Sequence, residues 1–418
     1  MKKQEKIEKP LLPAEDKPIF SDKKNVVRLV LFFAALAIAL SSIGYGVYRM
    51  GYQEPGPQEI VTDPDADLPY YNAGMSLVYT FTGSSGEIKT RKQEVKEAYT
   101  ALQKESFRLF DPEHTYPGVV NLASLTKQRG TPLAVSDALF SVLSDAWEKT
   151  ARGEGYSVLG GAVRAWRESL IYGYEQERRD PAADRETAEL LRELSALIRE
   201  NGVGALAFDR EKKTVALTYS AAYTAFLDRL GGDVPALDLD LLYDAYRLQY
   251  VARGLTEAGF DAGYLTTASG LSLVLSGGSA AEYCLYAQKN GETLVAATLR
   301  GEPGTAASLF RVFPLYGEEE GYYTVKEGGA TLFRHPYLTD FFAVQSLSAA
   351  LSAAPAERIP DAVYQNIRLF SAGGEELSSR LAGAGSAAIL LSDPLTVRSA
   401  AGEELTVNAQ AGYTVKKP

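Results

Sequence analysis

Three aspartates lie close together in the stretch ALDLDLLYDAYRLQYVARGLTEAGF, residues 236–260. Asp238 and Asp240 alternate with leucines, and Asp244 follows where the apolar pattern takes a helical period. Carboxylates grouped in this way could bind a hard divalent cation or accept a proton. The same alternation is typical of carboxylates that face solvent at a strand edge or approach a helix N-terminus, and we expect this for Asp238 and Asp240.

A histidine and a fourth aspartate could also take part in chemistry. His335, in LFRHPYLTD, could act as an acid or a base, although a lone histidine before Pro336 is more often a solvated loop residue. Asp361, in PDAVYQ, could bind a metal ion, but aspartate is a preferred helix cap, and we expect it to be the N-cap of DAVYQNIRLF. Two histidines and a single cysteine argue against a structural zinc site and exclude an intrachain disulfide.

An uncharged run of 20 residues, LVLFFAALAIALSSIGYGVY, occupies positions 29–48. At 1.5 Å per residue a helix of this length spans the hydrocarbon layer of a bilayer, about 30 Å. Lys23, Lys24 and Arg28 precede the run and acidic residues follow it, which predicts a transmembrane helix with residues 1–28 as a cytoplasmic tail and the remainder exported. A cleaved signal peptide is the alternative, but the apolar run is long for one and no clear A-x-A site follows.

The exported part is acidic. The whole chain carries a net charge of −10, and because residues 1–28 hold 8 basic and 5 acidic residues, the remainder carries −13. Such a surface repels nucleic acid, so we expect no nucleic-acid partner. Prolines spread over residues 49–72 predict an extended linker between the membrane segment and a large domain over residues 73–418.

Apolar periodicity in this domain favours helices first and strands later. Helical spacing predicts helices over residues 89–109, 136–150, 184–201 and 244–258. Alternating or short apolar runs predict strands over residues 77–82, 205–208, 214–219, 264–267, 271–275, 282–287 and 293–298. This order indicates an α+β domain rather than a regular βαβ sheet.

Six segments, in this order, resemble the FAD:protein FMN transferases, also called ApbE-like flavin transferases. They are GTPLAVSDALFSVLSDAWEKTARGEGYSVLGGAVRAW at 130–166, DRETAELLRELSALIRENGVGALAFDREKKTVAL at 184–217, the stretch at 236–260, TASG at 267–270, LFRHPYLTD at 332–340 and PDAVYQ at 360–365. The resemblance covers about residues 70–407. It implies a single large domain of mixed helices and antiparallel-rich sheet.

The resemblance also implies a chemistry and a set of site residues. Members of the family bind FAD, use Mg²⁺ against its diphosphate and transfer FMN to a threonine or serine hydroxyl of a partner protein, here an exported flavoprotein. Carried over along the motifs, the resemblance assigns flavin binding to Met75, Ser76, Asn121, Tyr156, Asp244, Tyr246, Ser269 and Gly270, catalysis to His335, and the metal to Asp361 and Gln365. Asp340 could serve in catalysis only if its loop slipped by two residues, because Leu338 occupies the matching position.

Several positions depart from the family pattern. Asp244 and Ala245 stand where the family has lysine and glycine, Ser269 where it has the first of two glycines, Leu338 where it has aspartate and Gln365 where it has threonine. Exchanging a cation for Asp244 turns an attraction of roughly 4 kcal/mol, at about 4 Å and an effective dielectric near 20, into a similar repulsion. We therefore expect a degenerate site with a flavin- or partner-binding role. An active Mg²⁺-dependent transferase is the alternative, and an unrelated anchored structural domain is a third interpretation.

Overall fold

The computed structural model describes residues 38, 40–42, 53–172, 180–181, 183–232, 234–289, 292–313, 315, 323–327, 330–334, 347–392, 395–400, 405–408, 412 and 414–416. Helices and antiparallel strands are mixed in it, so the α+β class predicted from the sequence is confirmed. Each helix and strand predicted between residues 77 and 298 has a counterpart within a few residues of its predicted bounds.

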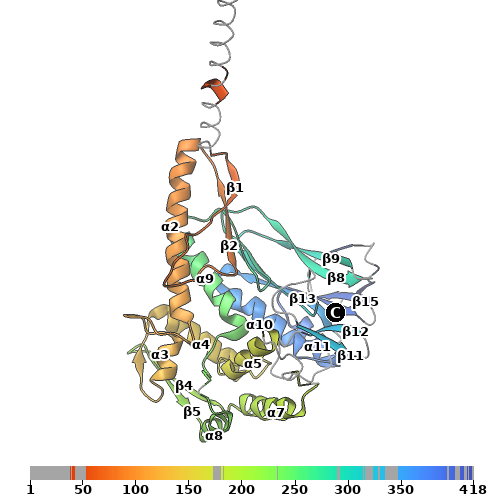
Figure 1. Cartoon of the computed structure of the whole chain (residues 1–418). Coiled ribbons are helices and arrows are strands. Elements are labelled where there is room, and N and C mark those ends of the chain that lie inside the picture. Colours follow the sequence, from red (N-terminus) through yellow and green to blue (C-terminus); the bar gives the residue numbers. More distant parts are fainter. Residues whose placement is uncertain are drawn as a thin grey trace, which may run out of the picture.

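Most of the described α-helices lie between residues 85 and 257, and two more lie in the last quarter of the chain (Figure 1). They are α2 (Ser85–Phe110), α3 (Leu122–Lys127), α4 (Asp137–Ala151), α5 (Gly161–Tyr172), α7 (Arg185–Arg199), α8 (Ala221–Leu230), α9 (Tyr243–Glu257), α10 (Ile359–Phe370) and α11 (Gly374–Ala382). Two 3-10 segments, η1 (Asp240–Leu242) and η2 (Ala356–Arg358), lead into α9 and α10. The Ser136 side chain accepts a hydrogen bond from the Leu139 N–H at 3.2 Å, which caps α4 where the sequence predicts its start.

A large sheet forms the other layer. Its described strands are, in spatial order, β1 (Gly56–Glu59), β2 (Met75–Phe81), β6 (Gly263–Thr267), β7 (Leu271–Val274), β10 (Thr305–Arg311), β13 (Leu347–Pro355), β14 (Ala387–Ser392), β15 (Leu395–Ser399) and β17 (Thr414–Lys416). Within these strands every neighbouring pair is antiparallel except β15 with β17. Smaller sheets join β16 (Leu405–Val407), β9 (Glu292–Gly301) and β8 (Ala281–Lys289); β3 (Leu133–Ala134), β5 (Thr214–Tyr219) and β4 (Gly204–Asp209); and β11 (Tyr323–Glu327) with β12 (Ala330–Arg334).

Both faces of the large sheet are buried around β13 and β14. Ala350 and Ile389 pack into the core shared with the helices, whereas the next residues, Leu351 and Leu390, pack into a second core with β8 and β9. Successive side chains of a strand point to opposite faces. This explains the uninterrupted apolar run of β14, and it places α9 and α10 on the helical side of the sheet (Figure 1).

The predicted linker over residues 49–72 is in large part folded into the domain, so this prediction is wrong from β1 onward. β1 pairs with β2, and Ile60, Leu68 and Tyr71 are buried. Pro57 is tolerated because β1 is the edge strand of the described sheet, where a missing N–H leaves no ladder bond unmade. Ile60, Leu68 and Tyr71 therefore belong to the core, whereas Val61 is exposed.

The predicted membrane segment, residues 29–48, lies outside the described residues except for positions 38 and 40–42, which are helical. Among the helices that the structure describes, none combines the length and the apolar character needed to cross a bilayer. Membrane anchoring therefore stays a prediction.

Candidate functional site

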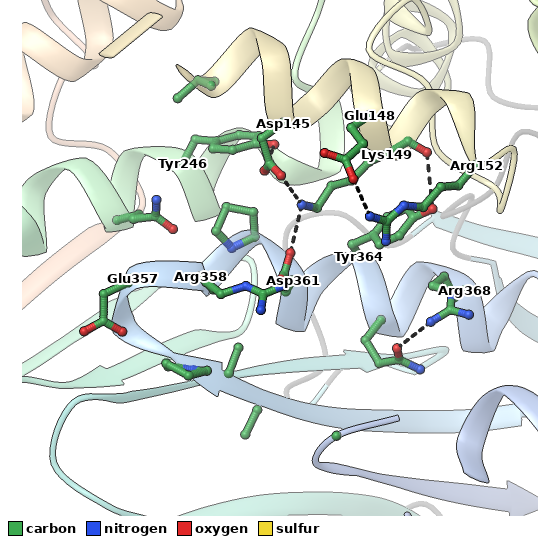
Figure 2. Close-up of a pocket in the computed structure, with 18 of the residues that line it drawn as sticks. Asp145, Glu148, Lys149, Arg152, Tyr246, Glu357, Arg358, Asp361, Tyr364 and Arg368 are labelled. Atoms are coloured by element: carbon green, nitrogen blue, oxygen red, sulfur yellow. Dashed lines mark hydrogen bonds and ion pairs between the residues drawn. The ribbon is translucent and has the colours of Figure 1, made fainter. Parts of the chain in front are cut away.

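A cavity of about 600 Å³ lies between α4 and α10, with α9, η2 and the end of β13 at its edges. Figure 2 shows Asp145 and Lys149 reaching into it from α4, Asp361 from α10 and Tyr246 from α9. The cavity thus brings together segments 130–166, 236–260 and 360–365, three of those that carry the family resemblance.

Helical spacing directs these side chains toward the cavity. Asp145 and Lys149 are four positions apart on α4, and Asp361 and Gln365 are four positions apart on α10, so each pair lies on one face of its helix. The N-cap of α10 is Arg358, so the expectation that Asp361 caps this helix is wrong. The helix starts earlier because proline is favoured in a first turn, and this leaves Asp361 inside the turn, facing α4.

Lys149 is the central charge of the cavity. Its side chain is only 4% exposed, and its Nζ lies 2.7 Å from Asp145 Oδ1 and 2.8 Å from Asp361 Oδ1 (Figure 2). An ammonium group removed from water is stable only when acceptors replace its hydration. Lys149 therefore joins α4 to α10 through two ion pairs and places a positive charge between the two carboxylates.

The second carboxylate oxygen of Asp361 and the amide oxygen of Gln365 are also paired. Asp361 Oδ2 lies 2.5 Å from Arg358 Nη2, and Gln365 Oε1 accepts a hydrogen bond from Arg368 Nη1 at 3.0 Å. Arg368 Nε in turn lies 2.7 Å from Glu154 Oε2. Each oxygen of Asp361 and the amide oxygen of Gln365 thus faces a cation supplied by the chain itself.

Three buried tyrosines support these charged groups. The Tyr246 hydroxyl donates to Asp145 Oδ2 at 2.7 Å, and the Tyr364 hydroxyl donates to Glu154 Oε2 at 3.0 Å. The ring of Tyr156 meets Tyr364 edge-on, with centroids 6.4 Å apart. Burial raises the pKa of Tyr246 and of Tyr156 well above the ordinary tyrosine value, so these hydroxyls stay protonated near neutral pH.

The oxygen atoms in the cavity do not fit a divalent cation. Mg²⁺ is bound by carboxylate, carbonyl and water oxygens. Here Asp361 and Gln365 are already engaged by Lys149, Arg358 and Arg368. Within the part of the chain that the structure describes, no group of three or more His, Cys, Asp or Glu side chains could hold a metal ion. The metal-binding role that the resemblance assigns to Asp361 and Gln365 stays a prediction, and the ion pairs disfavour it.

Asp238 and Asp240 form a second charged cluster, with α5. Asp238 is buried and lies 2.5 Å from Arg164, and Asp240 forms an ion pair with Arg167. The expectation that these aspartates face solvent at a strand edge is wrong, because residues 234–239 form no strand and pack against the start of α5. The alternative, an approach to a helix N-terminus, is confirmed, since they lead directly into η1 and α9.

A glycine permits this close packing. The Gly161 N–H donates to the Ala236 carbonyl at 2.9 Å, and a Cβ at Gly161 would lie 2.1 Å from the Pro235 carbonyl oxygen. Any other residue at position 161 would push the two segments apart. Burial raises the pKa of the Asp238 carboxyl, and the nearby Arg164 opposes this shift.

Four residues assigned to flavin binding lie at the ends of two neighbouring strands. Met75 and Ser76 begin β2, which pairs with β6, and Ser269 and Gly270 form the turn from β6 to β7. Gly270 has φ +84°, and a Cβ there would lie 2.6 Å from a backbone oxygen of β10, so the turn requires glycine. The structure brings these four residues together, but they lie outside the lining of the cavity between α4 and α10.

Asn121 and Asp244 have different surroundings. Asn121 is the buried N-cap of α3; its Oδ1 accepts from the Ser124 N–H at 2.9 Å, and its Nδ2 donates to the Arg108 and His114 carbonyls. Because its whole amide is engaged, a capping role is favoured. Asp244 is half-buried in the first turn of α9, where the helix dipole stabilises a carboxylate, and it is not part of the cavity lining.

The residues assigned to catalysis, His335 and Asp340, lie outside the described residues, as does Leu338. Their catalytic roles therefore stay predictions.

Lys149 and Asp145 are site residues that the sequence analysis did not identify. Their spacing of four within the predicted helix 136–150 is a sequence signal for an ion pair. The contact of Lys149 with Asp361 has no such signal, because α4 and α10 are far apart in the chain and meet only in the tertiary fold.

Comparison with solved structures identifies the fold. The ApbE protein of Thermotoga maritima matches with a TM-score of 0.53 at 12% sequence identity, over 86% of this chain and 98% of that chain. The flavinyl transferase ApbE of Pseudomonas stutzeri, in its apo form, matches with a TM-score of 0.51 at 14% identity, over 85% and 95%. No family model and no curated protein sequence matches the chain. The chain therefore has the fold of the ApbE flavin transferases.

Proposed function

We propose that this chain is a membrane-anchored, extracytoplasmic relative of the FAD:protein FMN transferases that binds a flavin or an exported partner and does not transfer FMN. The shared fold and the six matching segments support the relationship. One observation carries the loss of transfer: the carboxylate of Asp361 is paired with Lys149 and Arg358, and so is not available as a metal ligand. Family members need a metal ion against the diphosphate, and the described residues of this chain include no open ligand set for it.

A binding role fits the shape and charge of the site. The cavity volume lies within the range of small-molecule pockets, about 300–1,000 Å³. Asp244 lies outside the cavity lining, but it replaces the lysine that the resemblance places near the anionic diphosphate of FAD, and this supports weak affinity for FAD. Fold alone does not establish activity, so the chemistry of these residues decides between binding and catalysis.

Active transfer is the second candidate function. It is favoured by Tyr246, Asp361 and Gln365, three residues assigned to the site by the resemblance that all line one cavity. In that case a substrate would have to displace the ion pairs of Lys149 and Arg358.

Flavinylation of an acceptor separates the two functions. The full chain, purified in detergent, is incubated with FAD, Mg²⁺ and an acceptor domain that contains a target threonine, and the acceptor is weighed by mass spectrometry. We expect no added FMN, and flavin fluorescence should report at most weak binding that is independent of Mg²⁺. An FMN adduct made by the unmodified chain would establish the active transferase instead.

A variant with the family residues restored serves as the positive control for flavin binding. Asp244→Lys, Ala245→Gly, Leu338→Asp and Gln365→Thr together return four positions to the family pattern. We expect this variant to bind FAD more tightly than the unmodified chain, and equal affinities would contradict the assigned roles of these positions.

The anchor is tested separately. Protease added to intact cells should digest the chain after about residue 49 and spare the N-terminal tail, because the basic flank is retained in the cytoplasm. Protection of the large domain would contradict export.

A further inference from the structure

The Lys149 ammonium lies against the carboxylate to which the resemblance assigns a metal ion. We propose that Lys149 is a built-in cation that substitutes for a divalent metal in the cavity between α4 and α10 and makes the cavity metal-independent. Its Nζ is within 2.8 Å of Asp145 and of Asp361, carboxylates that belong to two different helices. A metal ion binds oxygen atoms from separate helices or strands, and here the ammonium group of a lysine side chain does the same.

The charges of the chain match those that a divalent ion would bring. Lys149 and Arg358 together place two positive charges on Asp361 and Asp145, which carry two negative charges. The ammonium is further stabilised by the ring of Tyr364, whose centroid lies 5.7 Å from Nζ. The pair of carboxylates is thus neutralised without any ion from solution.

The same geometry excludes a metal. A divalent ion bound to Asp361 Oδ1 would lie within a few ångströms of the Lys149 ammonium, where like charges repel strongly at the low effective dielectric of a partly buried site. The flexible lysine side chain cannot withdraw to water without leaving both of its partners. Removing Lys149 frees Asp145 Oδ1 and Asp361 Oδ1 for a metal, while Asp361 Oδ2 stays paired with Arg358.

Terbium luminescence tests this directly, because tyrosines next to a bound Tb³⁺ sensitise its emission, and Tyr246 and Tyr364 line the cavity. The full chain, purified in detergent, is titrated with Tb³⁺ alone. We expect no saturable emission from the unmodified chain and saturable emission from Lys149→Ala, at least tenfold above it and displaced by excess Ca²⁺. Lys149→Arg keeps the positive charge and should show no saturable Tb³⁺ emission.

Two further variants locate the signal. Adding Asp361→Asn to Lys149→Ala should abolish the emission, whereas Lys104→Ala, which frees Asp65 from a lysine 2.6 Å away at another place, should gain none. Circular dichroism shows which variants are folded. Emission from a folded Lys149→Ala chain no stronger than that of the unmodified chain would overturn the proposal.

The unmodified chain supplies a test that does not depend on any variant folding. Saturable Tb³⁺ emission or a Mg²⁺-dependent rise in its melting temperature, either one lost in Asp361→Asn, would also overturn the proposal. Since the probe is the metal alone, the result is independent of whether the chain binds flavin or transfers FMN.

Discussion

Two clusters of paired carboxylates in this molecule differ in which partner is buried. Around the cavity the base is buried and the acids are not: Lys149 is 4% exposed, against 42% for Asp145 and 30% for Asp361. In the Asp238–Arg164 pair at the start of α5 the order is reversed, because the Asp238 side chain is 5% exposed and Arg164 is 29% exposed. The carboxylates of Asp145 and Asp361 at the cavity are therefore accessible to solvent and ligands, whereas the carboxylate of Asp238 is buried.

This difference separates a site from a structural contact. Removing a base from buried acids leaves an unpaired charge away from water, which is strongly destabilising. Removing it from hydrated acids leaves charges that water can solvate. The two clusters should therefore respond differently to the same kind of substitution.

The largest effect is expected at Arg164. Arg164→Met leaves Asp238 buried and without its closest cation, and we expect the free energy of unfolding to fall by about 3 kcal/mol, the lower end of the range for a broken buried pair. Urea denaturation of the full chain in detergent measures the change. The control is Arg185→Met, since Arg185 is 91% exposed in its pair with Glu189 and should change stability by less than about 0.5 kcal/mol.

Lys149→Met should have a smaller effect, about 1–2 kcal/mol. Methionine fills nearly the same space, Asp361 keeps Arg358, and both carboxylates retain contact with water. The same denaturation experiment compares the two variants. A loss at Lys149 larger than that at Arg164 would contradict the distinction between a hydrated and a sealed cluster.

The elements of the fold could be predicted because their signals are local. Ser136 caps α4, and the apolar periodicity of residues 136–150 needs no knowledge of the tertiary structure. The linker prediction is wrong because it rests on the prolines and disregards the apolar residues Ile60, Leu68 and Tyr71. A sheet edge tolerates proline, and these three side chains are buried in the core.

The site was predictable only in part. The resemblance pointed to Asp361, Gln365 and Tyr246, and these do face one cavity. It gave no hint of Lys149, whose partner Asp361 lies on a helix far along the chain. The alternation of Asp238 with leucines predicts a strand edge near solvent, whereas Leu237, Leu239 and Asp238 itself are buried.

The pH dependence of stability offers a finer test of the sealed cluster. Burial raises the pKa of Asp238, so the folded state holds this proton more tightly than the unfolded state does. The stability gained in this way is present below about pH 4 and is lost as the pH rises through the raised pKa of the folded state. Asp238→Asn removes the titration.

We therefore expect the unfolding free energy of the wild type, relative to Asp238→Asn, to fall as the pH rises from 4 to 7, because the raised pKa of the folded state lies in this direction. Urea denaturation at several pH values measures it. A relative stability that rises with pH would mean that Arg164 outweighs burial and lowers the pKa of Asp238 instead.

The smallest effect is expected at the rim of the cavity. Tyr246→Phe removes the hydroxyl that donates to Asp145 Oδ2 at 2.7 Å, but this carboxylate keeps Lys149 and is partly open to water. A hydrogen bond to a charged group is worth about 1.5–3 kcal/mol, and solvation of the acceptor should reduce the loss to about 1 kcal/mol or less. Thermal or urea unfolding measures it, with the exposed Tyr70→Phe as a control of no expected effect. A loss of about 3 kcal/mol would show that Asp145 has no access to water, and the cavity would then be sealed in the same way as the cluster at Asp238.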